Sequence, residues 1–258
     1  MTNRVFPAEI VTGLSDFDAL AGPMPRGRVT VAAARSSAGA TAFALGVARH
    51  NDELGHRVLF ASFESGTDTI MGNLVAAITS VNVNRPLSIN EGRRARIERA
   101  REAMEQSRLQ VWSSALKAGS WPFSDLMEQL AAQPELALVV VDGYGQAAYG
   151  EPSEGATFAA LQQLARERNV AVLVTAHLMP ASETAEADPP ALSDLSPLED
   201  FLAEAGTTVI LHRPDRNGTV PQRRGEVVLI AVHGWQDTGS VTVRFEPEYH
   251  RFVDLPNQ

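Results

Sequence analysis

Cysteine is absent from the sequence, and its absence excludes disulfide bonds and thiolate metal sites. A chain without cysteine is typical of a reducing compartment, so we expect a cytoplasmic protein. Lysine is almost absent too, because Lys117 is the only one among the 22 basic residues. Arginine therefore carries nearly all of the positive charge.

The sequence also lacks any apolar run that approaches the roughly 20 residues needed to cross a bilayer. Its N-terminal stretch, MTNRVFPAEI, has no apolar core of the kind found in signal peptides. We therefore expect no membrane partner. The formal net charge of −9 disfavours non-specific binding to nucleic acid, although a local basic patch could override it.

What is present is the composition of an ordinary globular protein with alternating strands and helices. The 258 residues are 44% hydrophobic, which allows a sizeable core in one large domain or two small ones. Parallel strands joined by helices predict an α/β sheet covered on both faces. Strands are predicted at 28–34, 57–62, 109–112, 136–141, 170–176 and 207–212. Helices are predicted at 41–53, 67–80, 91–107, 122–132, 156–168 and 197–204.

The C-terminal part of the chain departs from this alternation. Residues 227–253 are predicted to form two or three β segments with a turn at 237–239, as an antiparallel extension at one sheet edge. The stretch 181–190 (ASETAEADPP) is predicted to be a mobile acidic loop.

Residues 34–41, which we call the 34–41 segment, follow an apolar strand and open an apolar helix, the setting of a phosphate-binding loop. Such loops usually end in Gly-Lys-Thr or Gly-Lys-Ser, but Ala40 stands here between Gly39 and Thr41. Backbone N–H groups at a helix N-terminus could still face an anion. The alternative is a strand-to-helix turn that kept its shape and lost its ligand. A missing lysine removes charge-assisted bonds of about 1.5–3 kcal/mol.

Several segments, in this order, resemble the C-terminal motor domain of the DnaB-type replicative helicases. They are residues 12–20, the 34–41 segment with 43–45 after it, 63–64, 139–142, 176–178, 192–195, 210–215, and the closing pairs 238–239 and 251–252. The resemblance covers nearly the whole chain and implies a RecA-like P-loop fold. It places an N-terminal arm or linker at 1–22 and a single RecA-like domain at 23–258, with no N-terminal collar domain.

The resemblance also implies a site for ATP and Mg²⁺. Its catalytic candidates are Glu64 as the general base that orients water, Asp142 at the end of a buried strand, and His177 as a sensor of the γ-phosphate. Thr41 and Asp142 are the implied Mg²⁺ ligands. The implied nucleotide-binding residues are Arg35, Ser36, Ser37, Gly39, Ala40 and Thr41. The alternatives are an exposed loop acid for Glu64, a polar strand end for Asp142 and a structural histidine for His177.

Two departures from the family pattern weigh against ATP turnover and DNA binding. Aligned on neighbouring residues, the Lys-x-Arg pair that reaches an adjacent subunit's site becomes Val232 and Gly234; Arg223 and Arg224 lie nearby and could replace it. Such a finger contributes roughly 10³–10⁵ in rate in comparable enzymes. The loops at 144–157 and 178–192, which line the DNA pore in the family, contain several acids but no lysine or arginine.

Three hypotheses for function follow. The first is a DnaB-like homologue that has lost ATP hydrolysis and acts as an assembly or regulatory protein in DNA replication or recombination. It would bind nucleotide weakly or not at all, and would self-associate as a ring or bind another replication protein. The second is an active ATP-dependent DNA helicase that uses non-standard residues. The third is a scaffold without a ligand. The runner-up family is the KaiC/RadA-like branch of the same superfamily.

Overall fold

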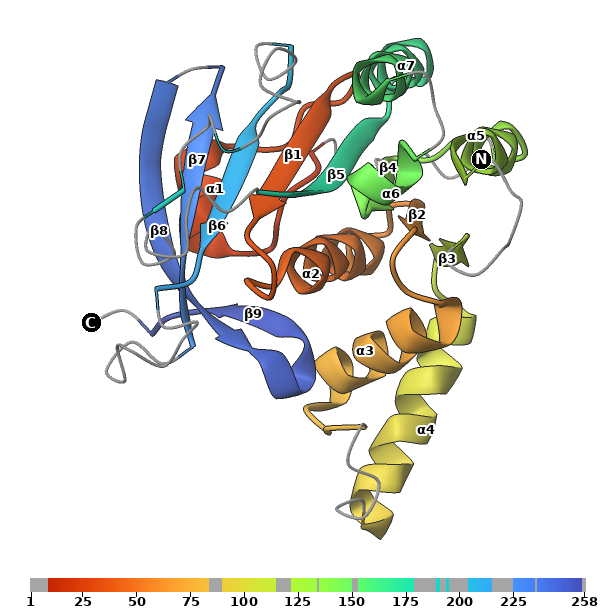
Figure 1. The fold of residues 1–258 in the computed structure, drawn as a ribbon. Coiled ribbons are helices and arrows are strands. Elements are labelled where there is room, and N and C mark those ends of the chain that lie inside the picture. The colour runs from red at the N-terminus through yellow and green to blue at the C-terminus, as the bar shows by residue number, and fades with distance from the viewer. Residues whose placement is uncertain are drawn as a thin grey trace, which may run out of the picture.

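The computed structural model describes residues 9–83, 90–114, 122–133, 135–149, 153–178, 189–190, 194, 204–214, 225–234 and 236–256. Its centre is a nine-stranded sheet with the strand order β3-β2-β4-β5-β1-β6-β7-β8-β9 (Figure 1). The strands are β1 (Val29–Ala34), β2 (Val58–Ser62), β3 (Leu109–Ser113), β4 (Leu138–Asp142), β5 (Ala171–His177), β6 (Thr208–His212), β7 (Glu226–His233), β8 (Gln236–Glu246) and β9 (Arg251–Asp254).

The sheet is parallel from β3 to β6 and antiparallel from β6 to β9. The change of direction follows the sequence, because a helix follows each of the strands β1 to β4, whereas β7, β8 and β9 are joined by short connections. This architecture confirms the predicted fold class, a mostly parallel α/β sheet with an antiparallel C-terminal extension.

Helices cover both faces of the sheet (Figure 1). They are α1 (Ser15–Ala21), α2 (Ala40–Glu53), α3 (Thr67–Thr79), α4 (Glu91–Glu105), α5 (Pro122–Ala131), α6 (Tyr144–Ala147) and α7 (Glu154–Arg168). Side chains of α1, α2 and α3 form one core against the sheet, and those of α5, α6 and α7 form a second core on the opposite face.

Alternation along the central strands divides their side chains between these cores. In β4, for example, Leu138 and Val140 join the core under α2, whereas Val139 and Val141 join the core under α7. All five residues of β4 are buried, as expected for a strand covered on both faces. Helix α4 packs on α3 through Ile97 and otherwise extends into solvent, in agreement with its charged sequence.

Most of the predicted elements are confirmed to within a few residues, but two predictions are wrong. Residues 237–239 form no turn, because they lie inside β8, where Gly239 pairs with Ala231 and the register shifts around Thr238. The extra residue is absorbed as a β-bulge, and the reversal falls instead after His233, which pairs with Gln236. Residues 144–157 are not one loop, since they contain α6 and the first turn of α7.

Three further predictions meet the limits of the described residues. The predicted helix at 197–204 and the predicted acidic loop at 181–190 lie almost entirely outside them. Within the predicted arm at 1–22, helix α1 packs on β8 and buries Phe17. Over the described parts of the chain, no helix combines the length and the apolar character needed to cross a membrane.

Candidate nucleotide site

The predicted site residues gather at one edge of the sheet, beyond the carboxyl ends of β1, β2, β4 and β5. This is the edge at which open α/β sheets bind ligands. Parallel pairing places strand ends next to each other: Ala34 of β1 lies beside His177 of β5, and Ser62 of β2 lies beside Asp142 of β4. The order of strands therefore brings together residues that are far apart in the sequence.

The 34–41 segment joins β1 to α2 by a tight turn. The Ala38 amide donates to the Arg35 carbonyl at 3.1 Å, and Ser37 and Gly39 have positive φ angles of 64° and 101°. Gly39 is the N-cap of α2, so the first turn of this helix opens toward the turn. Gly39 is also pressed against the C-terminal strands, since a Cβ placed there would lie 2.9 Å from Cζ of Phe252. A side chain is therefore excluded by both conformation and space.

The predicted nucleotide-binding residues of this segment do not all face one point. Ser36 and Ser37 are exposed, whereas Gly39, Ala40 and Thr41 are half-buried. Arg35 is buried and directs its guanidinium to Asp194, with 3.5 Å between Nη2 and Oδ2. The Arg35 side chain is therefore already engaged in an ion pair.

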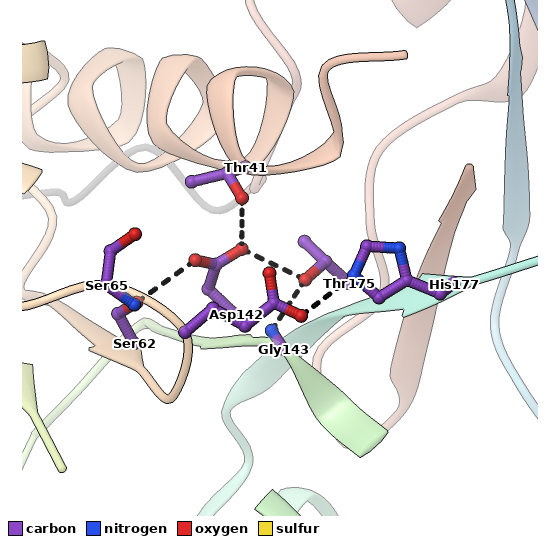
Figure 2. Close-up of polar contacts among 8 residues, drawn as sticks. Thr41, Ser62, Ser65, Asp142, Gly143, Thr175 and His177 are labelled. Atoms are coloured by element: carbon purple, nitrogen blue, oxygen red, sulfur yellow. Dashed lines mark hydrogen bonds and ion pairs between the residues drawn. The ribbon is translucent and has the colours of Figure 1, made fainter. Parts of the chain in front are cut away.

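Asp142 is completely buried and accepts hydrogen bonds from three hydroxyl groups (Figure 2). Thr41 donates to Oδ1 at 2.9 Å and Thr175 donates to the same oxygen at 3.0 Å. Ser62 donates to Oδ2 at 3.2 Å. The three donors come from α2, β5 and β2, so Asp142 connects the two strands beside β4 to the first turn of α2.

Burial raises the pKa of the Asp142 carboxyl above its ordinary value of 3.8. The hydrogen bonds from Thr41 and Thr175 lower it, the nearby charge of Glu64 raises it further, and the bond from Ser62 lowers it. Desolvation is the largest of these effects, because neutral hydroxyl groups replace only part of the hydration that a carboxylate loses. Asp142 is thus a carboxylate at a site that favours an added positive charge.

Glu64 and His177 form the second pair of the site. The Nε2 atom of His177 lies 2.8 Å from Oε1 of Glu64, and the carboxylate accepts the hydrogen bond. The side chains of His177 and Glu64 are 55% and 32% exposed, so the pair lies at the surface of the site. The Glu64 side chain also lies against Gly143, where an added Cβ would come within 2.6 Å of Cγ of Glu64. Glu64 is thereby fixed directly beside the end of β4.

Each member of this pair shifts the pKa of the other. The hydrogen bond from His177 lowers the pKa of Glu64, burial raises it, and the charge of His177 lowers it again. The hydrogen bond to Glu64 raises the pKa of His177, burial lowers it, and the charges of Glu64 and Asp142 raise it. A protonated His177 next to an ionised Glu64 is therefore the favoured state near neutral pH.

The structure brings together four of the predicted residues, Thr41 with Asp142 and Glu64 with His177. Sequence reasoning missed Ser62 and Thr175, although both are hydroxyl residues near the ends of strands that flank β4. That position next to a strand-end aspartate was the available signal. Sequence reasoning also missed the role of Arg213, whose Nη1 lies 3.5 Å from the Ser37 carbonyl oxygen.

The second cationic position of the family pattern is occupied differently. Val232 is buried in the core of β7, and Gly234 follows this strand with a φ of 59°. Neither residue carries a group that could reach another subunit. Arg223 and Arg224 lie outside the described residues. In the described part of the chain, no group of three or more His, Asp or Glu side chains could hold a metal ion.

Comparison with known proteins shows similarity to replicative helicases. The replicative DNA helicase DnaC of Bacillus subtilis (strain 168) is 23% identical over 258 residues, which are 95% of this chain and 56% of that protein. The replicative DNA helicase DnaB of Geobacillus stearothermophilus gives the same identity and coverage over 261 residues. The chain thus spans 56% of the length of these curated relatives.

Solved structures show the same fold. One solved ATPase domain superposes with a TM-score of 0.81 at 22% identity and covers 97% of this chain and 93% of that chain. A DnaB-like replicative helicase, described with its interactions with primase, gives a TM-score of 0.80 at 22% identity, over 96% of this chain and 62% of that one. The RadB recombinase is less similar, with a TM-score of 0.58 at 17% identity over 96% of this chain and 100% of that one. The sequence profile of the DnaB-like helicase C-terminal domain matches residues 9–254, and the chain therefore belongs to this family.

Proposed function

We propose that this DnaB-like domain has lost ATP hydrolysis, retains weak nucleotide binding and acts as an assembly or regulatory protein in DNA replication or recombination. The observation that carries this proposal is Ala40 at the first residue of α2, directly after the Gly39 cap. A methyl group there can neither bind a phosphate nor stabilise the charge that develops during phosphoryl transfer. The geometry around it is kept, but the cation is not.

Retained binding is supported by the shape of the 34–41 segment. Gly39 keeps its left-handed conformation, and the first turn of α2 presents backbone N–H groups without intrahelical partners toward the turn. A turn that had lost every ligand would not need a residue whose conformation and space both require glycine. The affinity should be lower than that of a lysine-containing loop by about the 1.5–3 kcal/mol of a charge-assisted hydrogen bond.

The residues fit a magnesium ion only together with a nucleotide. The Thr41 hydroxyl and the Asp142 carboxylate lie 2.9 Å apart and are the oxygen ligands on offer. Mg²⁺ takes near-octahedral oxygen coordination and usually keeps several waters beside one or two protein ligands and substrate phosphates. In this position the ion would neutralise phosphate charge and the buried Asp142 charge at once.

The second candidate is an active ATP-dependent helicase that uses non-standard residues. The observation that favours it is the Glu64–His177 pair, which holds a carboxylate beside Asp142 at the place where a water-activating base would act. The same bond argues against it, because a base held in an ion pair is less able to accept a proton. The missing cations at Ala40 and Gly234 add to this argument.

The assembly role can be tested by mixing. The DnaB-like helicase of known structure is described with primase, so replication proteins are the first partners to test. Native mass spectrometry of this chain with a full-length DnaB-family helicase from the same source, with and without ATP, should show mixed oligomers. Unwinding by that helicase should change as the chain is added. A chain that forms no mixed species and leaves unwinding unchanged would contradict the assembly role.

A further inference from the structure

We propose that Arg213 supplies the positive charge that Ala40 cannot, and that it recognises the phosphate chain of the bound nucleotide. This inference rests on the proposed nucleotide binding and assigns the residue that makes it possible. Arg213 comes directly after β6, which pairs with β1 so that Leu211 lies beside Ala34. Arg213 and the 34–41 segment therefore leave the sheet at the same edge and next to each other.

The Arg213 side chain is directed at this segment. Its Nη1 atom lies 3.5 Å from the Ser37 carbonyl oxygen, at the outer limit of a hydrogen bond. A guanidinium has five N–H donors and binds phosphate oxygens in a bidentate manner. A weak bond to a carbonyl oxygen can therefore be exchanged for stronger bonds to an anion without moving the residue far.

Two aromatic rings hold both sides of this contact. The guanidinium carbon of Arg213 lies 5.8 Å from the centre of the Phe245 ring, within cation–π range. Phe245 stacks on Phe252 with their centres 4.8 Å apart, and Phe252 is the ring pressed against Gly39. The same pair of rings thus supports the arginine and the turn that it faces, and fixes one relative to the other.

Arg35, the other arginine at this turn, is less suited to the task. It is buried, and its guanidinium faces Asp194 at 3.5 Å. Moving it to a phosphate would leave a carboxylate that is only 15% exposed without this partner. Arg213 is half-buried and lies at the open side of the turn, so it can meet an anion at little cost in desolvation.

The test is the affinity of the intact chain for ATP, ADP and adenosine, measured by competition with a fluorescent ATP analogue. Arg213→Gln should weaken ATP and ADP binding by about tenfold or more, as expected for a lost charge-assisted bond, and leave adenosine unchanged. Arg244→Gln is the matched control, because Arg244 is exposed on β8 beside Phe245 and makes the same change in charge. Arg213→Lys should keep part of the preference for ATP over adenosine.

A second comparison asks whether Arg213 stands in for the missing lysine. Ala40→Lys should tighten ATP binding, and it should restore binding to the Arg213→Gln chain. If the wild type binds ATP and Arg213→Gln binds it equally well, the role of Arg213 is overturned while nucleotide binding stands. If the wild type binds no ATP, even where Ala40→Lys does, the retained binding and the role of Arg213 are both overturned. Thermal unfolding of each variant verifies that the fold is intact.

Discussion

The Thr41 hydroxyl donates a hydrogen bond of 2.9 Å to the Asp142 carboxylate and joins the first turn of α2 to the end of β4. Thr175 and Ser62 complete the set of donors around the same carboxylate. Hydroxyl groups thus stabilise a buried acid in a site whose phosphate-loop lysine is missing. The two groups that would hold Mg²⁺ are in direct contact, ready for an ion but not dependent on one.

Replacing Asp142 by asparagine should raise the melting temperature of the ligand-free chain at pH 8. The amide has nearly the shape of the carboxylate and still accepts a hydrogen bond, but it carries no charge to desolvate. Because burial raises the pKa of folded Asp142, its unfavourable contribution is fully present above that raised pKa and disappears as the pH falls to 3.8. The gain in melting temperature should therefore shrink between pH 8 and pH 4.

Calorimetry or circular dichroism over this pH range measures the effect. Glu102→Gln, at an exposed position on α4, is the control for the loss of one negative charge. An Asp142→Asn chain that melts below the wild type at pH 8 would show that hydrogen bonding outweighs desolvation at Asp142.

The Glu64–His177 pair predicts a histidine that titrates above its ordinary pKa of 6.5. Glu64→Gln should return the pKa of His177 toward 6.5, which NMR of the histidine rings can follow. Glu167→Gln on α7 is the control. A His177 titration that is identical in the Glu64→Gln chain would contradict the pairing.

The stability that this pair contributes has a defined pH window. The Glu64 part is present above pH 4.5 and is lost as the pH falls through its lowered folded pKa. The His177 part is present below pH 6.5 and is lost as the pH rises through its raised folded pKa. Because His177 is more than half exposed, the pair should contribute less than about 1 kcal/mol. The free energy of unfolding of His177→Gln, followed from pH 4 to pH 9, tests this window.

Two glycines near the start of α2 should respond to alanine in opposite ways. Gly39→Ala should destabilise the chain by about 1–3 kcal/mol, because φ is 101° and the new Cβ would meet the Phe252 ring. Gly46→Ala should stabilise it by about 0.5–1 kcal/mol, because Gly46 lies within α2 with open space around it. Chemical denaturation of both variants measures the difference. Equal effects at the two positions would contradict the described turn.

Ala40→Lys should tighten nucleotide binding without restoring turnover. The lysine would return a cation to the 34–41 segment, but Val232 and Gly234 would still offer nothing to a neighbouring site. Turnover in Ala40→Lys alone, measured as phosphate release, would show that another residue already serves as the finger. Comparison with the chain carrying both Ala40→Lys and Gly234→Arg separates the two losses.

The strands and the fold class could be predicted because buried parallel strands appear as continuous apolar runs such as 136–141. The site was predictable where a residue ends such a strand, as Asp142 does. Ser62 and Thr175 were not, because their role depends on which strands pair with β4 and in what register. The contact of Arg213 with Ser37 likewise depends on β6 lying beside β1, which local sequence does not specify.

The error at 237–239 has a similar cause. Asp237, Thr238 and Gly239 have the composition of a turn, and local pattern cannot distinguish a turn from a bulged strand. Pairing with β7 decides the outcome, and the Thr238 hydroxyl donates to the Ala231 carbonyl at 2.9 Å inside the ladder.

The central claim is the loss of ATP hydrolysis, and phosphate release from ATP and Mg²⁺ by the purified chain tests it most directly. The assay is run with and without single-stranded DNA, and beside the Asp142→Asn chain as the control for a contaminating ATPase. We predict no release above the level of Asp142→Asn in either condition. Release that single-stranded DNA stimulates and Asp142→Asn abolishes would contradict the claim and identify an active helicase motor.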